Sequence, residues 1–346
     1  MKATRTFRRP RVLIVGCGDV GMRCVPLLRP HAHVFALTSH AERSAELRAA
    51  GVSPLLGDLD ERRSLKRLAG LAPTVLHLAP PQKTGDDDRR TRALLATLGM
   101  RRDVALPRAA GSFAPIGRLR RARASCAATE PINIVPEGVR RAAASRAPLR
   151  LVYASTTGVY GDCGGAWIDE TRAAKPANAR AKRRMSAERQ LRRATARGTI
   201  AASIARIPGI YAGNRLPLAR LEKRTPALID ADDVYTNHIH ADDLAAILVR
   251  LATHGRPARV IHASDDSSLK MGEYFDLVAD AFGLARAPRI TRAQAEQQIE
   301  PTLLSFMRES RRLVNRRLKE ELGVRLRYPS VGHFLREAGA GKADAK

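Results

Sequence analysis

A short glycine-rich turn near the N-terminus constrains the fold of this chain more than any other stretch. An apolar run, VLIV, has the length and β-branching of a buried parallel strand and leads directly into Gly16, Gly18 and Gly21. Gly16 would allow a tight turn, Gly18 would let the backbone approach a pyrophosphate, and Gly21 would let the next helix pack closely. Free N–H groups where that helix begins, around Asp19 and Val20, would receive the phosphates. The pattern predicts a dinucleotide-binding turn, and the alternative is an ordinary glycine-rich turn that binds nothing.

Beyond this turn, candidate strands alternate with candidate helices. Apolar stretches bounded by turn residues predict strands at residues 12–15, 33–37, 52–56, 74–78, 149–154, 199–205 and 260–263. Amphipathic stretches predict helices at residues 20–28, 41–50, 60–68, 89–98, 181–196, 272–282 and 310–322. This alternation predicts an α/β protein with a Rossmann-type doubly wound parallel sheet and a smaller C-terminal substrate-binding part.

The predicted organisation has three parts. A nucleotide-binding domain covers residues 11–205, a substrate-binding part covers 206–336, and a flexible tail covers 337–346. An arginine- and proline-rich stretch at about 99–148 interrupts the first domain without clear periodicity. We expect it to be a surface insertion, away from the sheet edge where ligands bind.

The ends of the second and third strands predict how the adenosine half of a cofactor would be held. The second strand ends at Thr38 with no acidic residue to bind a ribose 2′-hydroxyl, and Arg43 follows shortly. This favours the 2′-phosphate of NADP over NAD, although Arg43 could equally be a solvated helix residue. Asp58 and Leu59 follow the third strand, where the carboxylate would either accept from the adenine amino group or cap the next helix.

Other strand ends meet at the same edge of the predicted sheet. Leu78 and Ala79 would lie under the diphosphate–ribose region of the cofactor, and Pro208 lies in the turn after the sixth strand. The fifth strand runs into Ser155 and Thr156, whose hydroxyls would face the crevice beside the glycine turn.

The charge of the chain is unusual for an enzyme. It has 61 lysines and arginines against 34 acidic residues, a net charge of +27 that would suit a polyanion-binding protein. The basic residues are spread along the chain and aromatic residues make up only 4%, so a nucleic-acid partner is not expected. A coding bias toward arginine explains the composition more simply. The four cysteines lack metal-ligand spacing, and no membrane span or signal peptide is apparent, so we expect a cytoplasmic location.

A set of motifs resembles, in order and rough spacing, the extended short-chain dehydrogenase/reductases, which include the NAD-dependent epimerases and dehydratases. The motifs are Gly16-x-Gly18-x-x-Gly21, Gly57-Asp58-Leu59, His77-Leu78-Ala79, Ser155-Thr156-x-x-Val159-Tyr160-Gly161, Arg206-Ile-Pro-Gly-Ile-Tyr211 and His240-x-Asp242-Asp243. The resemblance implies a nicotinamide cofactor, NADP or NAD, and a small-molecule substrate. It also implies that a homodimer can form through helices beside the fifth strand.

One departure from the family pattern limits what the resemblance implies about catalysis. Members carry a Tyr-x-x-x-Lys unit on the helix after the fifth strand, and alignment on Glu188 places Arg184 at the lysine and Arg180 at the tyrosine. Arginine stays protonated near neutral pH and is a poor proton donor. Thr156, Ser155 and Arg184 therefore remain as catalytic candidates.

Two further residues near the predicted crevice have side chains that can move a proton. His77 has a suitable ordinary pKa, but strand alternation could turn it into the core. Tyr160 more often packs in such a motif than takes part in chemistry.

The sequence predicts an NAD(P)-dependent oxidoreductase or epimerase/dehydratase-like enzyme with a non-standard acid or base. Its substrate would be a small carbonyl, alcohol or nucleotide sugar. A non-catalytic protein that senses NADP(H) is the alternative, and a polyanion-binding protein is a third reading.

Overall fold

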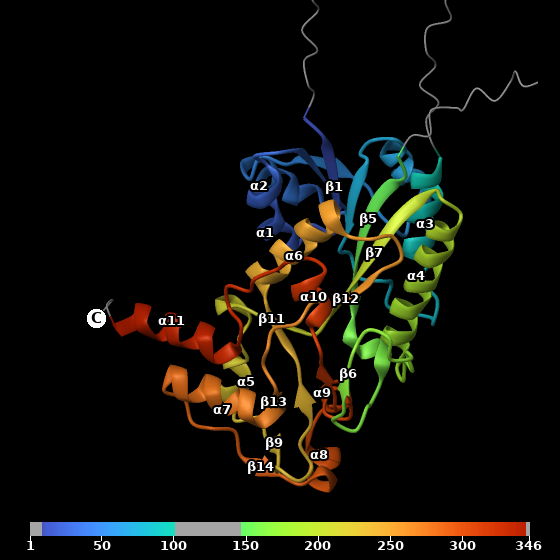
Figure 1. The fold of residues 1–346 in the computed structure, drawn as a ribbon. Helices are drawn as coiled ribbons and strands as arrows, with labels where there is room; N and C mark the ends of the chain where they lie inside the picture. Colours follow the sequence, from blue (N-terminus) through green and yellow to red (C-terminus); the bar gives the residue numbers. More distant parts are fainter. Residues whose placement is uncertain (1–8, 101–146, 344–346) are drawn as a thin grey trace, which may run out of the picture. The chain divides into compact units, whose positions relative to one another are not determined.

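The computed structural model describes residues 9–100 and 147–343, and these contain a seven-stranded parallel sheet with the order β12-β7-β5-β4-β1-β2-β3 (Figure 1). Its strands are β1 (Arg11–Val15), β2 (His33–Thr38), β3 (Ser53–Leu56), β4 (Thr74–His77), β5 (Leu149–Thr156), β7 (Ile200–Ile207) and β12 (Val260–His262). The sheet confirms the predicted α/β, doubly wound Rossmann-type fold, and the predicted strands are found to within two residues at most of their ends.

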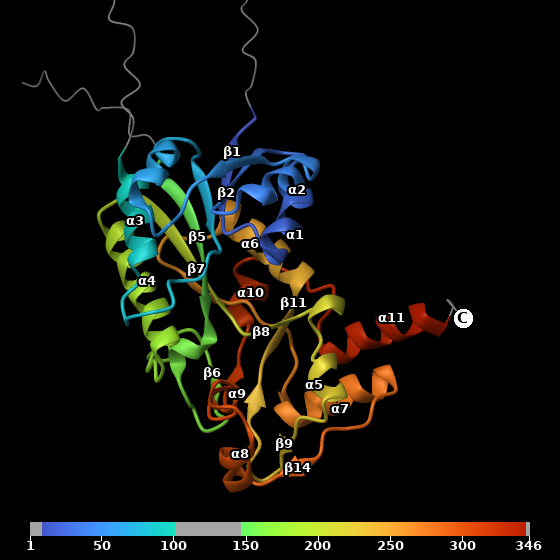
Figure 2. The same cartoon turned by 180° about the vertical axis from the view of Figure 1, so that it is seen from behind.

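Helices cover both faces of this sheet, because alternate strand residues point to opposite sides. Val12 and Ile14 pack with α1 (Asp19–Leu28), α2 (Ser44–Ala49) and α6 (Ala241–His254) on one face. Leu13 and Val15 pack with the 3₁₀ helix η2 (Arg62–Leu68), α3 (Arg89–Gly99) and α4 (Ala179–Ala196) on the other face. Figures 1 and 2 show these two layers from opposite sides.

The direction of the strand order reverses beside β1. The chain passes from β1 to β2 and β3 on one side, and then crosses to β4 on the other side. Crevices outside the carboxyl ends of strands at such a reversal are where open α/β sheets bind ligands. The glycine turn leaves β1 at this point, so the topology places it in the crevice.

The C-terminal part is built from short elements. Its paired strands are β6 (Trp167–Ile168) with β15 (Arg312–Leu313), β8 (Gly209–Tyr211) with β11 (His238–His240), β9 (Ala227–Leu228) with β14 (Arg289–Ile290), and β10 (Tyr235–Thr236) with β13 (Leu269–Lys270). Its helices are η3 (Thr157–Tyr160), η4 (Gly213–Arg215), α5 (Leu218–Glu222), α7 (Met271–Phe282), α8 (Arg292–Gln298), α9 (Pro301–Phe306), α10 (Arg316–Glu320) and α11 (Val331–Ala343).

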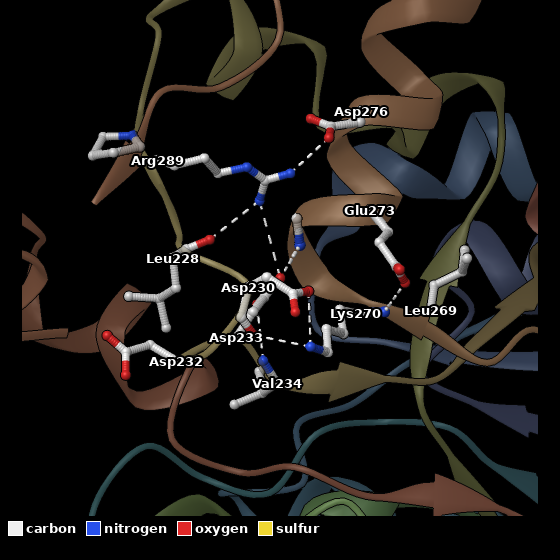
Figure 3. A network of polar contacts seen from close by, with 12 residues as sticks. Leu228, Asp230, Asp232, Asp233, Val234, Leu269, Lys270, Glu273, Asp276 and Arg289 are labelled. Atoms are coloured by element: carbon white, nitrogen blue, oxygen red, sulfur yellow. Dashed lines mark hydrogen bonds and ion pairs between the residues drawn. The ribbon is translucent and has the colours of Figure 1, made fainter. Parts of the chain in front are cut away.

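An acidic loop at residues 230–233 holds several of these elements together (Figure 3). Asp233 accepts hydrogen bonds from the N–H groups of Val234 and Gly272, both at 2.8 Å, and so caps the start of α7. Asp232 accepts from the first N–H of α8, at 2.8 Å. Arg289 joins Asp276 of α7 to the backbone carbonyl before this loop, at 2.6 and 3.3 Å. One loop thus caps two helix N-termini.

Some predicted elements differ from the structure. The α-helix predicted at 60–68 is a 3₁₀ helix that begins at Arg62, and residues 41–50 divide into the 3₁₀ helix η1 (Ala41–Arg43) and α2. The helix predicted at 310–322 begins only at Arg316, because residues 312–313 pair with β6 instead. Pairing with a distant segment overrides the local helical pattern here.

The predicted insertion and tail have different outcomes. The insertion at 99–148 lies outside the described residues except at its two ends. The tail boundary predicted at 337 falls inside α11, which continues to Ala343. No helix among the described residues is both long and apolar enough to cross a membrane.

Candidate functional site

The glycine turn has the geometry that its sequence predicts. Gly16 has a φ of +88°, and a Cβ there would lie 2.5 Å from the backbone nitrogen of Ala79. Around Gly21, a Cβ would lie 3.3 Å from the Gly16 carbonyl oxygen and 3.4 Å from Ile14, so the helix packs closely on the strand. A Cβ on Gly18 would meet no described atom within 4 Å. The turn therefore presents open space at Gly18, where helix α1 begins.

A cavity of about 430 Å³ lies against this turn, between the ends of β1, β2, β3 and β4. It brings together most of the residues predicted to bind the cofactor: Gly16, Gly18, Thr38, Arg43, Asp58, Leu59, Leu78 and Ala79. Four others do not line it: Asp19, Val20, Gly21 and Pro208. The cavity also includes Arg90, which the sequence analysis missed because it reaches back from α3.

Arg43 is tied to the glycine turn rather than left in solvent. Its Nη1 donates to the Cys17 carbonyl oxygen at 2.7 Å, and its other nitrogens donate to Glu46 at 3.0 and 3.1 Å. Arg90 similarly donates to Asp60 at 2.8 Å and to the Pro80 carbonyl oxygen at 3.2 Å. Both cavity arginines are thus held by a carboxylate and a backbone carbonyl.

Asp58 and Asp19 already have structural partners. Asp58 Oδ1 accepts from the N–H of Asp60 at 2.9 Å, a local turn bond. The N-cap of the following helix η2 is Glu61, whose side chain accepts from the N–H of Arg63, so the prediction that Asp58 caps this helix is wrong. Asp19 accepts from Arg23 at 3.2 Å and from Arg215 at 3.0 Å. Burial alone would raise the pKa of Asp19, but the hydrogen bonds from the two arginines lower it. Asp19 therefore connects α1 to the C-terminal part through its side chain.

Ser155 and Thr156 point in different directions, because adjacent strand residues alternate. Ser155 is buried, and its hydroxyl donates to Glu188 Oε1 at 2.6 Å, beneath α4. Its hydroxyl therefore does not face the crevice as predicted. Thr156 is partly exposed, and its hydroxyl accepts from the N–H of Gly158 at 3.2 Å.

Glu188 forms a buried ion pair with Arg206. Arg206 donates to the two Glu188 oxygens at 3.1 and 2.7 Å, and the side chains are 0% and 4% exposed for Glu188 and Arg206. Burial alone would lower the pKa of Arg206, but the hydrogen bonds and charge of Glu188 raise it. The Arg206 guanidinium also lies over the Tyr160 ring, 4.6 Å from its centre. This pair ties the helix after β5 to the end of β7.

Arg184, the candidate at the lysine position, lies against the end of β5. Its Nη1 donates to the Ala154 carbonyl oxygen at 2.6 Å and to the Tyr153 hydroxyl at 3.2 Å. Both acceptors of this guanidinium lie on β5. The partly exposed hydroxyl of Thr156 lies at the end of the same strand. The structure therefore places Arg184 and Thr156 at the same strand end.

His77 and Tyr160 have the structural roles that the sequence analysis left open. His77 bonds to the Thr91 hydroxyl at 2.9 Å, and burial lowers its pKa to about 3. Tyr160 lies 2.5 Å from His262 Nε2, and burial raises its pKa to about 12. Both side chains are buried and are bonded within the core, so neither faces the crevice.

Sequence reasoning missed Glu309, which lies beside the catalytic candidates. It accepts from Asn178, the N-cap of α4, at 3.2 Å and from Arg311 at 3.0 Å. Thr156 Oγ1 and Glu309 Oε2 lie 3.6 and 3.9 Å from the position that a Cβ on Gly158 would take. No local pattern marks Glu309, because it reaches this place from a distant segment before β15.

Taken together, the sheet, its reversal beside β1 and the glycine turn define a Rossmann-type nucleotide-binding protein. The comparison with family models is more specific. The chain belongs to the NAD dependent epimerase/dehydratase family, whose model matches residues 12–263. No curated protein matches the sequence significantly.

Solved structures share the fold at low sequence identity. A functionally unknown conserved protein from Silicibacter pomeroyi is 23% identical, with a TM-score of 0.69 and coverage of 96% of this chain and 99% of that one. MoeE5 in complex with UDP-glucose and NAD is 17% identical, with a TM-score of 0.64 and coverage of 97% and 99%. UDP-glucose 4-epimerase from Thermotoga maritima, solved with UDP-glucose, is 14% identical, with a TM-score of 0.66 and the same coverage. At these identities the likeness shows the fold alone.

Proposed function

We propose that this protein binds a nicotinamide dinucleotide in the cavity beside the glycine turn. We further propose that it is an oxidoreductase or an epimerase/dehydratase-like enzyme acting on a small carbonyl, alcohol or nucleotide sugar. The observation that carries the proposal is the open space at Gly18, which lies at the start of α1 and next to the cavity. A pyrophosphate there would meet backbone N–H groups and the positive end of the helix dipole. The relatives' structures with NAD support the same assignment.

The charges of the cavity favour NADP over NAD modestly. Thr38, Ser39 and His40 line it at the end of β2, so no carboxylate from this strand end would bind a 2′-hydroxyl. Arg43 and Arg90 supply positive charge, but Glu46 and Asp60 partly neutralise it. We expect a preference for NADP of about tenfold, equivalent to ~1.4 kcal/mol.

Residues at the end of β5 would orient the substrate. A bound nicotinamide would supply or accept a hydride. Thr156 would hold the substrate oxygen by a hydrogen bond, as the family's hydroxyl residue does. Arg184 would act as a cation for ribose or phosphate oxygens, because hydrogen bonds to the Ala154 carbonyl oxygen and the Tyr153 hydroxyl fix its guanidinium at the end of β5.

Calorimetric titration of NADP and NAD into the full chain tests the proposal. In Gly18→Ala, a methyl group enters space that contains no described atom, so the fold should remain while dinucleotide affinity falls at least tenfold. Gly99→Ala is the matched control, since its Cβ also meets no described atom, but at the far end of α3. Absence of binding to either nucleotide at millimolar concentration would overturn the proposal.

A binding protein without catalysis is the second candidate. The alignment on Glu188 supports it: this alignment predicts Arg180 where the family has its tyrosine acid, and arginine does not give up its proton readily. Turnover of NAD(P)H with a panel of carbonyl compounds and nucleotide sugars separates the two. Tight dinucleotide binding without turnover across that panel would favour the sensor.

A further inference from the structure

The side chain at the family's tyrosine position has an unusual environment. Arg180 is exposed, and its guanidinium lies 4.4 Å from the centre of the Phe306 ring in α9. Among the side chains that the structure describes, it has no hydrogen-bond or ion-pair partner. Partial burial of the guanidinium lowers the pKa of Arg180, and the neighbouring charges of Arg184 and Arg183 lower it further, against an opposing effect of Glu309. The guanidinium is therefore covered on one side by an aromatic ring and has no described acceptor.

The surrounding groups leave this place with surplus positive charge. Arg184 and Arg311 contribute two further guanidinium groups, while Glu309 supplies a carboxylate that accepts from Arg311 and Asn178. Arg311 Nε is buried and donates no hydrogen bond within the described residues. Two guanidinium groups thus retain unused donors around one carboxylate that is already bonded twice.

This place adjoins the proposed substrate position. Asn178 begins α4 two residues before Arg180, and its side chain bonds Glu309. Glu309 in turn lies across Gly158 from the Thr156 hydroxyl. The start of α4 lies beside the end of α9, where Arg180 contacts Phe306, and α4 also packs against η3. A substrate held by Thr156 would therefore extend toward Arg180.

We infer that Arg180, with Arg311 behind it, receives an anionic group of the substrate, a carboxylate or a phosphate. Guanidinium groups recognise both through paired N–H donors. The inference rests on the proposed function, because it assigns the substrate class of that same site. In this chain the residue at the tyrosine position holds the substrate instead of donating a proton to it.

NMR titration of the arginine Nε–H groups tests the inference on the full chain with saturating NADP. The probes are glycolate for a carboxylate and inorganic phosphate for a phosphate. The Arg180 resonance is identified by its loss in Arg180→Met. Arg189, which is exposed on the same helix as Arg180 is, is assigned through Arg189→Met and is the control. We expect a saturable shift of Arg180 at about tenfold lower anion concentration than any shift of Arg189. The probe that gives the saturable shift, glycolate or phosphate, identifies the kind of anion that the site binds.

Two outcomes would overturn the inference. One is an Arg180 response no stronger than that of Arg189 with both anions, while NADP still binds. The other is a lower melting temperature for Arg180→Met, since a residue kept for structure should destabilise when replaced. We expect an unchanged or higher melting temperature for Arg180→Met and retained anion binding in Arg180→Lys. Loss of NADP binding itself would instead refute the proposed function, so the two failures can be told apart.

Discussion

The buried ion pair between Glu188 and Arg206 gives the sharpest test of how the core is held. Both side chains are essentially inaccessible, and Glu188 also accepts from the Ser155 hydroxyl. Glu188→Leu would leave the Arg206 charge buried without its acceptor, and Arg206→Met would do the same to Glu188. Each single replacement should lower the free energy of unfolding by about 3–5 kcal/mol.

The double variant should lose much less unfolding free energy than the sum of the losses in the two single variants. Replacing both charges with apolar groups of similar volume is often nearly neutral, because the desolvation cost of both ions disappears. Ser155 would lose its acceptor, at about 1 kcal/mol. We therefore expect a coupling energy between Glu188 and Arg206 of at least ~2 kcal/mol.

Urea unfolding followed by circular dichroism, for the wild type, both single variants and the double variant, measures this coupling. The matched control is Arg286→Met, which breaks an exposed pair with Asp280 and should cause no measurable change. Additive losses in the double variant, or single losses below about 1 kcal/mol, would refute the reasoning.

Three further predictions follow from burial and close contact. The pKa of His77 is about 3 against an ordinary 6.5, so the unfolded state binds the extra proton and stability falls as pH drops through this window. His77→Gln should reduce the slope of unfolding free energy against pH, measured between pH 4.5 and 6, by about 1.4 kcal/mol per pH unit. Burial raises the pKa of Asp265 to about 7 from 3.8, so its charge destabilises as pH rises through that range. The difference in urea midpoint between Asp265→Asn and the wild type should therefore favour the variant more at pH 8 than at pH 5. Gly16→Ala should lower the melting temperature where Gly18→Ala does not, because only the Gly16 Cβ would meet the Ala79 backbone, at 2.5 Å.

The elements that sequence reasoning found are those fixed by local pattern. The glycine spacing and the apolar strands depend on residues a few positions apart, so the Rossmann-type sheet could be predicted. Cavity residues such as Thr38 and Ala79 follow from the rule that strand ends meet at one edge. Because β1 lies where the strand order reverses, the glycine turn that follows it correctly indicated where the cavity lies.

The features that were missed depend on contacts between distant segments. Ser155 lies on the face of β5 that turns away from the crevice, and its hydroxyl donates to Glu188, which is distant from it in sequence. In the helix predicted at 310–322, residues 312–313 instead form a strand that pairs with β6. Glu309 enters the site only because that same segment folds back against the start of α4. Local periodicity carries no information about such pairings.

The arginine excess has a structural use that composition alone does not reveal. Many guanidinium groups donate to backbone carbonyl oxygens, which any chain supplies, so they do not require matching acidic residues. Such donors include Arg43 to Cys17, Arg150 to Ala252, Arg183 to Gly85, Arg184 to Ala154, Arg250 to Leu322 and Arg312 to Gly165. This satisfies buried donors at loop ends, where unpaired polar groups would be costly. Arg180 differs from these residues, because its guanidinium packs on the Phe306 ring and finds no acceptor among the described side chains. Alignment on Glu188 predicts it at the position where the family carries its tyrosine, and an anionic ligand is the acceptor that we propose for it.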